Sequence, residues 1–162
     1  IIMGSGMDDT ILKCKFIVRQ AKGSGGEITI RNLTIKKPVS IQENTYEQVT
    51  FLNVKVEVNA GQIENDALAV NTCSGKFLLY CCEIIGGEDG LSLMDRNTNA
   101  TINSTDISYA SCRGIFANPD FKIKESAVYN CGSYGIKGRS GWTDLGGNNL
   151  QPGPWNEWGG GY

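Results

Sequence analysis

The octapeptide GGEDGLSL, Gly86–Leu93, is the clearest copy of a phrase that recurs along this chain. Other versions, each with a polar residue, a small residue and then alternating apolar side chains, are NDALAV (65–70), CRGIFA (112–117) and SYGIK (133–137). Counted from Asp66 through Asp89 and Arg113 to Tyr134, the copies are 23, 24 and 21 residues apart. A self-similar period of this length is typical of a solenoid, in which each repeat forms one coil.

A second phrase alternates with the first and carries apolar or small residues at its first, third, sixth and eighth positions. The spacing of two, three and two predicts two short strands separated by a bend, and no segment has the apolar spacing of a helix. The bend residues of the copies share one column, where stacked Asn and Ser side chains can hydrogen-bond to each other. The copies are Ile28–Ile35, Val49–Val56, Phe77–Ile84, Ala100–Ile107 and Phe121–Val128, and their bend residues are Asn32, Asn53, Cys81, Ser104 and Glu125.

Stacked coils bury each inward side chain against its copies above and below, and they pair all backbone groups except those at the two ends. We therefore expect an all-β fold, a parallel β-helix of about six coils, over residues 1–138. Residues 139–162 contain the three tryptophans and many glycines and do not fit the repeat. We interpret them as an irregular tail that caps the last coil, and a carbohydrate platform is the alternative, since tryptophan rings stack on sugars.

The composition excludes several classes of function. The chain has no histidine, which rules out Ser-His-Asp and Cys-His catalysis and most zinc sites. Because 15 Lys and Arg face 17 Asp and Glu, there is no electrostatic footprint for nucleic acid. No apolar run approaches the length that spans a bilayer. We therefore expect no nucleic-acid partner and no membrane insertion.

Cysteines and sequons bear on where the protein acts. The six cysteines lack paired CxxC spacing, so we interpret most of them as small buried core residues, with one or two disulfides as the alternative. Three sequons begin at Asn32, Asn99 and Asn103 and are compatible with secretion. We expect an extracellular location or one on the surface of a cell envelope or virion.

The repeating phrases, together with the opening segment Ile1–Leu12 (IIMGSGMDDTIL), resemble the right-handed parallel β-helix of the pectin-lyase-like superfamily. The resemblance covers about residues 1–138. It implies the fold and a saccharide ligand, because that superfamily contains lyases, hydrolases, esterases and epimerases. It also contains phage tailspikes and non-catalytic surface proteins, so the scaffold alone does not imply an activity.

In register, Asp66, Asp89, Arg113 and Tyr134 form one column at the start of equivalent strands. Three uses of this column are open. The two carboxylates can divide acid and base roles, since like charges at short distance raise one pKa. They can bind Ca²⁺ together with Glu88 and Asp95 as further oxygen ligands. Alternatively, Arg113 neutralises Asp89 in an exposed ladder.

Comparison with two branches of the superfamily names further candidates. The polygalacturonase-like pattern is Asn-x-Asp, Asp-Asp, Gly-His-Gly and Arg-x-Lys on successive coils, and this chain has Asp66, Asp89, Arg113 and Lys137 to Arg139 at similar places. Its histidine position holds Arg113, which puts hydrolase activity in doubt. Resemblance to a pectate lyase implies instead Ca²⁺ on the carboxylates, with Arg113 or Lys137 removing a proton from a uronate.

Our first interpretation is a non-catalytic or weakly catalytic scaffold that contacts glycans or partner proteins, and the alternative is a polysaccharide lyase or, less well supported, a glycoside hydrolase. Ile1 begins inside an expected strand, so we also expect another polypeptide or a further segment to abut the N-terminal end. In both interpretations the expected substrate-binding residues are Glu88, Tyr134, Arg139, Trp142 and Trp155.

Overall fold

A computed structural model describes residues 1–19, 26–42, 47–59, 66–71 and 75–151, and the regular elements in these ranges are β-strands. No helix that could cross a membrane is found among these residues. The strands are β1 (Ile2–Met3), β2 (Ile11–Leu12), β3 (Phe16–Arg19), β4 (Glu27–Ile35), β5 (Val39–Gln42), β6 (Gln48–Glu57), β7 (Leu68–Val70), β8 (Lys76–Tyr80), β9 (Glu83–Ile85), β10 (Asp89–Leu93), β11 (Asn99–Asn103), β12 (Asp106–Ser108), β13 (Arg113–Ala117), β14 (Phe121–Lys124), β15 (Ala127–Tyr129), β16 (Tyr134–Gly138), β17 (Trp142–Asp144) and β18 (Asn149–Leu150).

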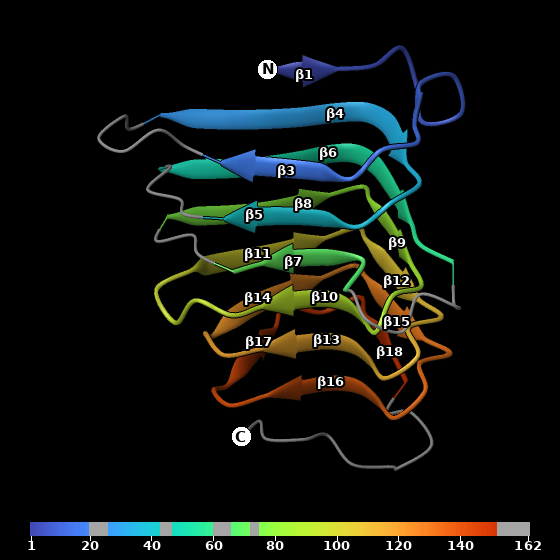
Figure 1. Cartoon of the computed structure of the whole chain (residues 1–162). Helices are drawn as coiled ribbons and strands as arrows, with labels where there is room; N and C mark the ends of the chain where they lie inside the picture. The colour runs from blue at the N-terminus through green and yellow to red at the C-terminus, as the bar shows by residue number, and fades with distance from the viewer. Residues whose placement is uncertain (20–25, 43–46, 60–65, 72–74, 152–162) are drawn as a thin grey trace.

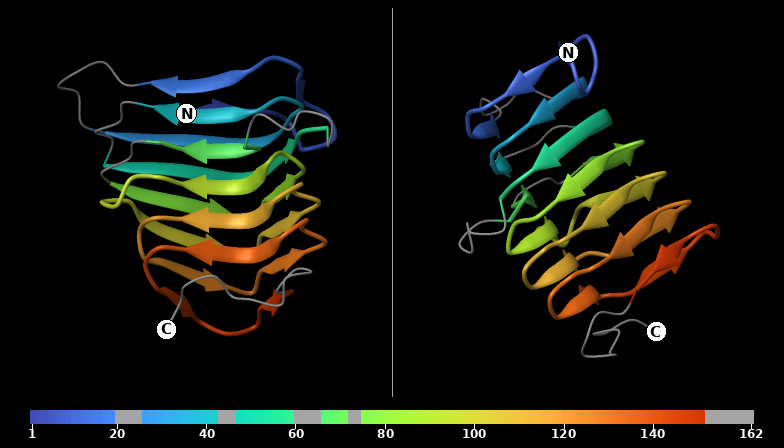
Figure 2. Two further views of the ribbon diagram at one scale, coloured as in Figure 1. Left: turned by 60° about the horizontal axis from the view of Figure 1, so that its bottom comes forward. Right: turned by 90° about the vertical axis from the view of Figure 1, so that its right-hand side faces the viewer.

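The strands stack into a parallel β-solenoid of about five turns, which confirms the expected fold class (Figures 1 and 2). One face is a six-stranded sheet in the order β16-β13-β10-β7-β5-β3. The remaining strands form a twelve-stranded sheet that bends around the core, with β6 paired to both β8 and β9. Each coil therefore contributes a strand to the six-stranded sheet, which lies in front in Figure 1.

The apolar positions of the second phrase form much of the buried core. Its third position places Ile30, Phe51, Leu79, Ile102 and Ile123 in one continuous register. All five side chains are buried between the sheets, and the alternate residues of the same strands face outward. Because parallel coils stack in register, a period in the sequence becomes a column in space.

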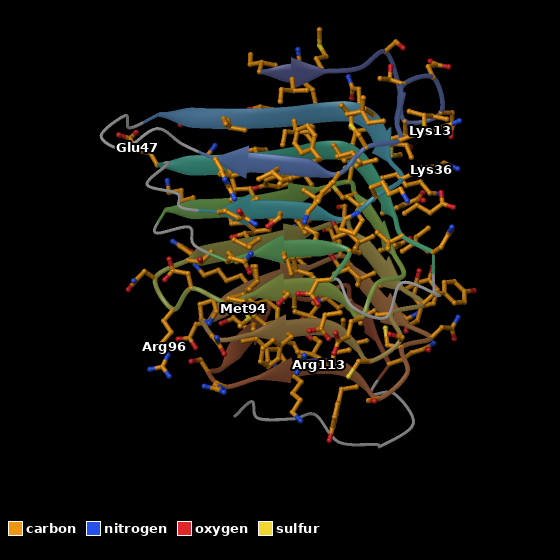
Figure 3. The ribbon with its side chains drawn as sticks, viewed as in Figure 1. Lys13, Lys36, Glu47, Met94, Arg96 and Arg113 are labelled. Carbon is orange, nitrogen blue, oxygen red and sulfur yellow. The ribbon has the colours of Figure 1, made fainter. Side chains whose placement is uncertain are left out.

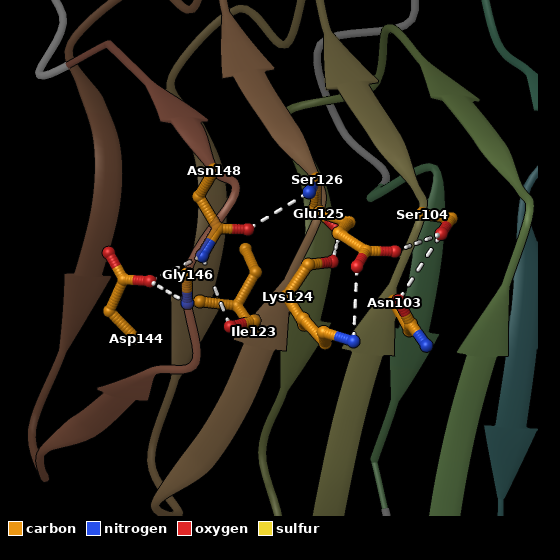
Figure 4. A network of polar contacts seen from close by, with 9 residues as sticks. All are labelled: Asn103, Ser104, Ile123, Lys124, Glu125, Ser126, Asp144, Gly146 and Asn148. Atoms are coloured by element: carbon orange, nitrogen blue, oxygen red, sulfur yellow. Dashed lines mark hydrogen bonds and ion pairs between the residues drawn. The ribbon is translucent and has the colours of Figure 1, made fainter.

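The predicted bend column is present, and each of its residues has a left-handed backbone. Asn32 has φ 56° and Asn53 has φ 55°, and the Asn53 Nδ2 donates a hydrogen bond of 3.0 Å to the Asn32 Oδ1. Farther along the column, the Ser104 hydroxyl lies 3.5 Å from the Glu125 carboxylate (Figure 4). Left-handed backbone disfavours most side chains, so Asn and Ser stabilise these bends both by their conformation and by the ladder they form.

The bend column predicts a stabilising substitution at Cys81. This exposed residue has φ 52° and follows Asn53 in the column. Asparagine tolerates the left-handed region better and can continue the amide ladder, so we expect Cys81→Asn to raise the free energy of unfolding by about 0.5 to 1 kcal/mol. Urea denaturation under reducing conditions measures this, and Cys14→Asn, at an exposed cysteine outside the column, is the matched control. An equal effect of both substitutions would contradict the ladder.

Parallel pairing continues beyond Gly138, where we expected the repeat to end. β17 pairs with β14, which places Trp142 beside Phe121, and their rings stack with centroids 6.2 Å apart. β18 pairs with β15 through Leu150. This partial coil was not evident from the sequence, because the polar Asp144 occupies the register position of the buried Ile123 and interrupts the apolar pattern. The rest of the expected tail, including Trp155, lies outside the described residues.

The cysteines of the described segments are all free. Cys82 and Cys131 are buried, and burial raises the pKa of each thiol to about 11. Both therefore act as small core residues. Only these two of the five described cysteines are buried, since Cys112 is half-buried and the others are exposed, so the expectation that most cysteines lie in the core was wrong for the described residues. Cys14 and Cys81 are exposed.

The first coil leaves Ile1, Met3 and Ile11 exposed at its outer edge. The expectation that another polypeptide or a further segment abuts this end, which was based on Ile1, stays a prediction.

Candidate functional site

Four strands of the six-stranded sheet, β7, β10, β13 and β16, carry the first phrase of the sequence. The register pairs Asp89 with Arg113 and Arg113 with Tyr134. Asp66 precedes β7 in the same column, and the Asp89 backbone N–H donates to its Oδ1 at 3.3 Å. The polar residue of each coil therefore lies directly against that of the next coil.

Asp89 and Arg113 form a two-point ion pair within this column. The Arg113 Nε and Nη2 each donate a hydrogen bond of 2.7 Å to a separate oxygen of the Asp89 carboxylate. Only 2% of the Asp89 side chain is exposed, and the Arg113 guanidinium lies 3.9 Å from the centroid of the Phe116 ring. Figure 3 shows Arg113 on this face. Of the three uses considered for the column, the geometry of Asp89 is that of neutralisation by Arg113, but Asp89 is buried and not part of an exposed ladder as we expected.

The ion pair determines whether Arg113 could act as a catalytic base. Burial disfavours its cation, but the hydrogen bond and the charge of Asp89 outweigh burial and raise the pKa of Arg113 above its ordinary value. A guanidinium held in this way keeps its proton and cannot accept one from a substrate. The geometry therefore disfavours proton abstraction by Arg113.

The donor set does not fit a calcium ion. Both Asp89 oxygens are engaged by Arg113, and no three His, Cys, Asp or Glu side chains among the described residues gather in a geometry that could hold a metal. Asp66, Glu88 and Asp89, proposed as calcium ligands from the sequence, are all described and do not form such a group. Ca²⁺ needs several oxygens directed at one point, and here a guanidinium takes two of them.

Asp66 is the other carboxylate of the column and is half-buried. Burial raises its pKa, hydrogen bonds from the Ser92 side chain and the Asp89 backbone oppose the rise, and the charge of Glu88 adds to it. Asp66 therefore lies in an environment that would favour a positive charge close by.

Asp66 borders a pocket of about 290 Å³ on the outer face of β5 and β7. Most of its walls are polar. The Ser40 hydroxyl on β5 accepts hydrogen bonds from Gln42 Nε2 at 2.8 Å and from Asn71 Nδ2 at 3.2 Å. Arg19 in turn donates to Gln42 Oε1 at 2.7 Å. The lining residues are Lys15, Pro38, Val39, Ser40, Gln42, Asp66, Ala69, Asn71 and Glu88.

Sequence reasoning missed the β5 and β7 side of this pocket. Ser40 and Gln42 alternate with buried Val39 and Ile41, an ordinary strand pattern that carries no chemical motif. No sequence signal marks them, because their polar neighbours on β7 are known only from the register of β5 with β7.

The other predicted site residues are spread over the molecule. The Lys137 ammonium lies 4.4 Å from the Tyr134 ring centroid, and both residues are on β16, at the far end of the sheet from β5. Arg139 follows β16 and is exposed. Trp142 lies in the twelve-stranded sheet. The structure thus brings Asp66, Glu88, Asp89, Arg113 and Tyr134 to one face, with Lys137 at its edge, and places Trp142 elsewhere.

Comparisons of the chain with protein-family models, with curated proteins and with solved structures give no match.

Proposed function

We propose that this chain is a non-catalytic β-solenoid module that binds a glycan in the pocket on the outer face of its six-stranded sheet. The observation that carries the proposal is the chemistry of the pocket. A hydroxyl, two amides, two carboxylates and an ammonium border one solvent-open hollow, contributed by Ser40, Gln42, Asn71, Asp66, Glu88 and Lys15.

Such a lining suits a ligand rich in hydroxyl groups. Binding sites for apolar ligands are lined mainly by hydrophobic side chains, with few polar groups. Here the polar groups include acceptors and donors, and a sugar hydroxyl is both. The hydrogen bonds among Arg19, Gln42, Ser40 and Asn71 hold these side chains in place before a ligand arrives. A preorganised site loses less entropy on binding.

Binding is favoured over catalysis because the strongest candidate groups are already engaged. Asp89 is paired with Arg113, and the Lys137 ammonium lies over the Tyr134 ring. Resemblance to the pectin-lyase-like superfamily supports a saccharide ligand and an extracellular or surface location, both as parts of this proposal.

The test is titration calorimetry with three β- or α-1,4-linked hexasaccharides: cellohexaose, the glucosamine hexamer of chitosan, and hexagalacturonate. We expect at least one of them to bind, and the double variant Ser40→Ala/Asn71→Ala to weaken that binding about tenfold or more, since each lost hydrogen bond is worth about 1 kcal/mol. The matched control, Asn99→Ala, alters an exposed asparagine of the twelve-stranded sheet and should leave binding unchanged.

Two results would overturn this proposal. One is the absence of binding by all three hexasaccharides. The other is release of unsaturated uronides from hexagalacturonate by the parent protein, detected by ultraviolet absorbance, because it would show lyase activity.

A further inference from the structure

Three Asn-x-Thr sequons lie in the twelve-stranded sheet, outside the proposed binding pocket. They begin at Asn32 on β4 and at Asn99 and Asn103 on β11. An asparagine that carries an N-linked oligosaccharide has to lie on the protein surface, and the transferring enzyme also recognises the hydroxyl two residues further on. The three sequons can therefore be ranked by the exposure and the hydrogen bonds of these two side chains.

The Asn32 sequon is engaged in the fold. The Asn32 Oδ1 accepts a hydrogen bond of 3.0 Å from Asn53 in the bend column. Thr34 is buried, and its hydroxyl donates to the Met7 backbone oxygen at 2.6 Å. In the folded chain an enzyme therefore cannot reach the Thr34 hydroxyl, and an oligosaccharide on Asn32 would lie directly against the ladder.

The Asn103 sequon is engaged in a similar way. The Ser104 hydroxyl donates to the Asn103 Oδ1 at 3.2 Å (Figure 4). Thr105 is fully buried, and its hydroxyl donates to the Asn103 backbone oxygen at 3.0 Å and accepts from the Cys82 N–H at 3.4 Å. The hydroxyl of this sequon is therefore part of the core.

The Asn99 sequon differs from both. Asn99 is the exposed first residue of β11, and Thr101 on the same strand is half-buried. Residues two apart on a strand project from the same face of the sheet, so the Asn99 amide and the Thr101 hydroxyl lie on one side. Among the residues that the structure describes, neither side chain has a hydrogen-bond partner. This sequon therefore stays accessible in the folded protein.

Asn99 also borders a hollow of about 230 Å³ beside β11 and β14. The other residues that line it include Asp120, Lys122 and Thr143. Their carboxylate, ammonium and hydroxyl groups can hydrogen-bond to the hydroxyls of a sugar, and the hollow leaves space for one next to the strand. The surroundings of Asn99 therefore suit an attached sugar.

We infer that Asn99 is the acceptor of an N-linked oligosaccharide when the chain is made in a secretory pathway. In the transfer, the Asn99 Nδ2 forms a bond to the anomeric carbon of an oligosaccharide that is carried on a lipid pyrophosphate. The bond between that carbon and the pyrophosphate oxygen breaks, the lipid pyrophosphate leaves, and the amide gives up one proton. This modification goes beyond the proposed binding function and does not depend on it.

The test is secretion of the full chain by cultured human cells, directed by a signal peptide that is cleaved off. Peptide N-glycosidase in heavy-oxygen water converts each glycosylated asparagine into a labelled aspartate, which mass spectrometry detects. Fragment spectra separate Asn99 from Asn103, which lie on one tryptic peptide. We expect the label at Asn99 in most molecules, and at Asn32 and Asn103 in few.

Two variants should each abolish the label at residue 99. Asn99→Gln removes the acceptor amide, and Thr101→Ala removes the hydroxyl while Asn99 remains. Asn97→Gln, at an exposed asparagine of the preceding turn that begins no sequon, is the matched control and should keep the oligosaccharide on Asn99. Circular dichroism of each secreted variant shows whether it is folded.

Two results would overturn the inference. One is an unlabelled Asn99 in secreted, folded protein. The other is labelling of Asn32 or Asn103 to the same extent as Asn99, because the burial of Thr34 and Thr105 would then not matter. Glycan binding is tested separately with the hexasaccharides, so each proposal can fail while the other stands.

Discussion

An Arg113→Met variant is expected to lose about 3 to 5 kcal/mol of unfolding free energy at neutral pH, because it leaves a buried carboxylate without its partner. Asp89 is 2% exposed and receives two hydrogen bonds of 2.7 Å from Arg113. Asp66, one rung away, is a second source of negative charge that raises the pKa of Asp89. Methionine retains an apolar stem of similar length but neither the charge of the guanidinium nor its position over the Phe116 ring.

The loss depends on pH with a definite sign. Burial already raises the pKa of Asp89 in the parent protein, and Arg113 opposes that rise, so removing Arg113 raises the pKa further. A carboxyl whose pKa is higher in the folded than in the unfolded state binds more protons when folded, and stability falls as pH rises through this interval. The deficit of Arg113→Met is therefore largest above the raised pKa of Asp89 and shrinks as the solution is acidified.

Urea denaturation at several pH values measures the effect, with Lys55→Met as the matched control. Lys55 pairs with Glu83 at 3.1 Å, but both side chains are more exposed, and such surface pairs contribute at most about 1 kcal/mol. The double variant Asp89→Asn/Arg113→Met should recover most of the loss, because no buried charge remains unpaired. If Arg113→Met and Lys55→Met are equally mild, the ion pair is not structurally important.

The fold was predictable because a parallel solenoid converts sequence period directly into spatial neighbours. Ile30, Phe51 and Leu79 occupy the same position of the phrase, and the register places them beside one another. The bend residues were predictable for the same reason, and Asn32 and Asn53 are hydrogen-bonded as expected. Both predictions needed only the alternation of apolar residues and the length of the repeat.

The candidate site was less predictable, since its chemistry depends on directions that spacing does not determine. The spacing placed Asp66, Asp89 and Arg113 in one column, but it left open which carboxylate Arg113 faces. The structure resolves this through the two hydrogen bonds to Asp89. Ser40 and Asn71 gave no signal, because an outward polar residue on a strand is ordinary until its neighbours on the next coil are known.

Gly86 lies in the turn that precedes Glu88 and Asp89. A Gly86→Ala variant is expected to lose about 4 kcal/mol or more of unfolding free energy. Its backbone has φ 83°, which side-chain-bearing residues rarely adopt. A Cβ there would also lie 1.9 Å from the Val58 backbone oxygen, a contact that no rotamer can relieve. The Gly86 N–H donates to the Ser108 oxygen at 2.9 Å, so the chain cannot move outward without losing this hydrogen bond.

Gly146→Ala separates the cost of the left-handed backbone from the cost of the clash with Val58. Gly146 has a similar φ of 95°, but no atom lies within 4 Å of the added Cβ. It should lose about 1 to 2 kcal/mol, the cost of left-handed backbone alone. Equal losses in urea denaturation would show that the approach of Gly86 to Val58 is unimportant.

The Gly86→Ala substitution should also affect binding, since Glu88 and Asp89 directly follow this turn. A folded Gly86→Ala protein should bind the hexasaccharides more weakly than the parent, whereas Gly146→Ala, far along the chain from the pocket, should bind them equally well.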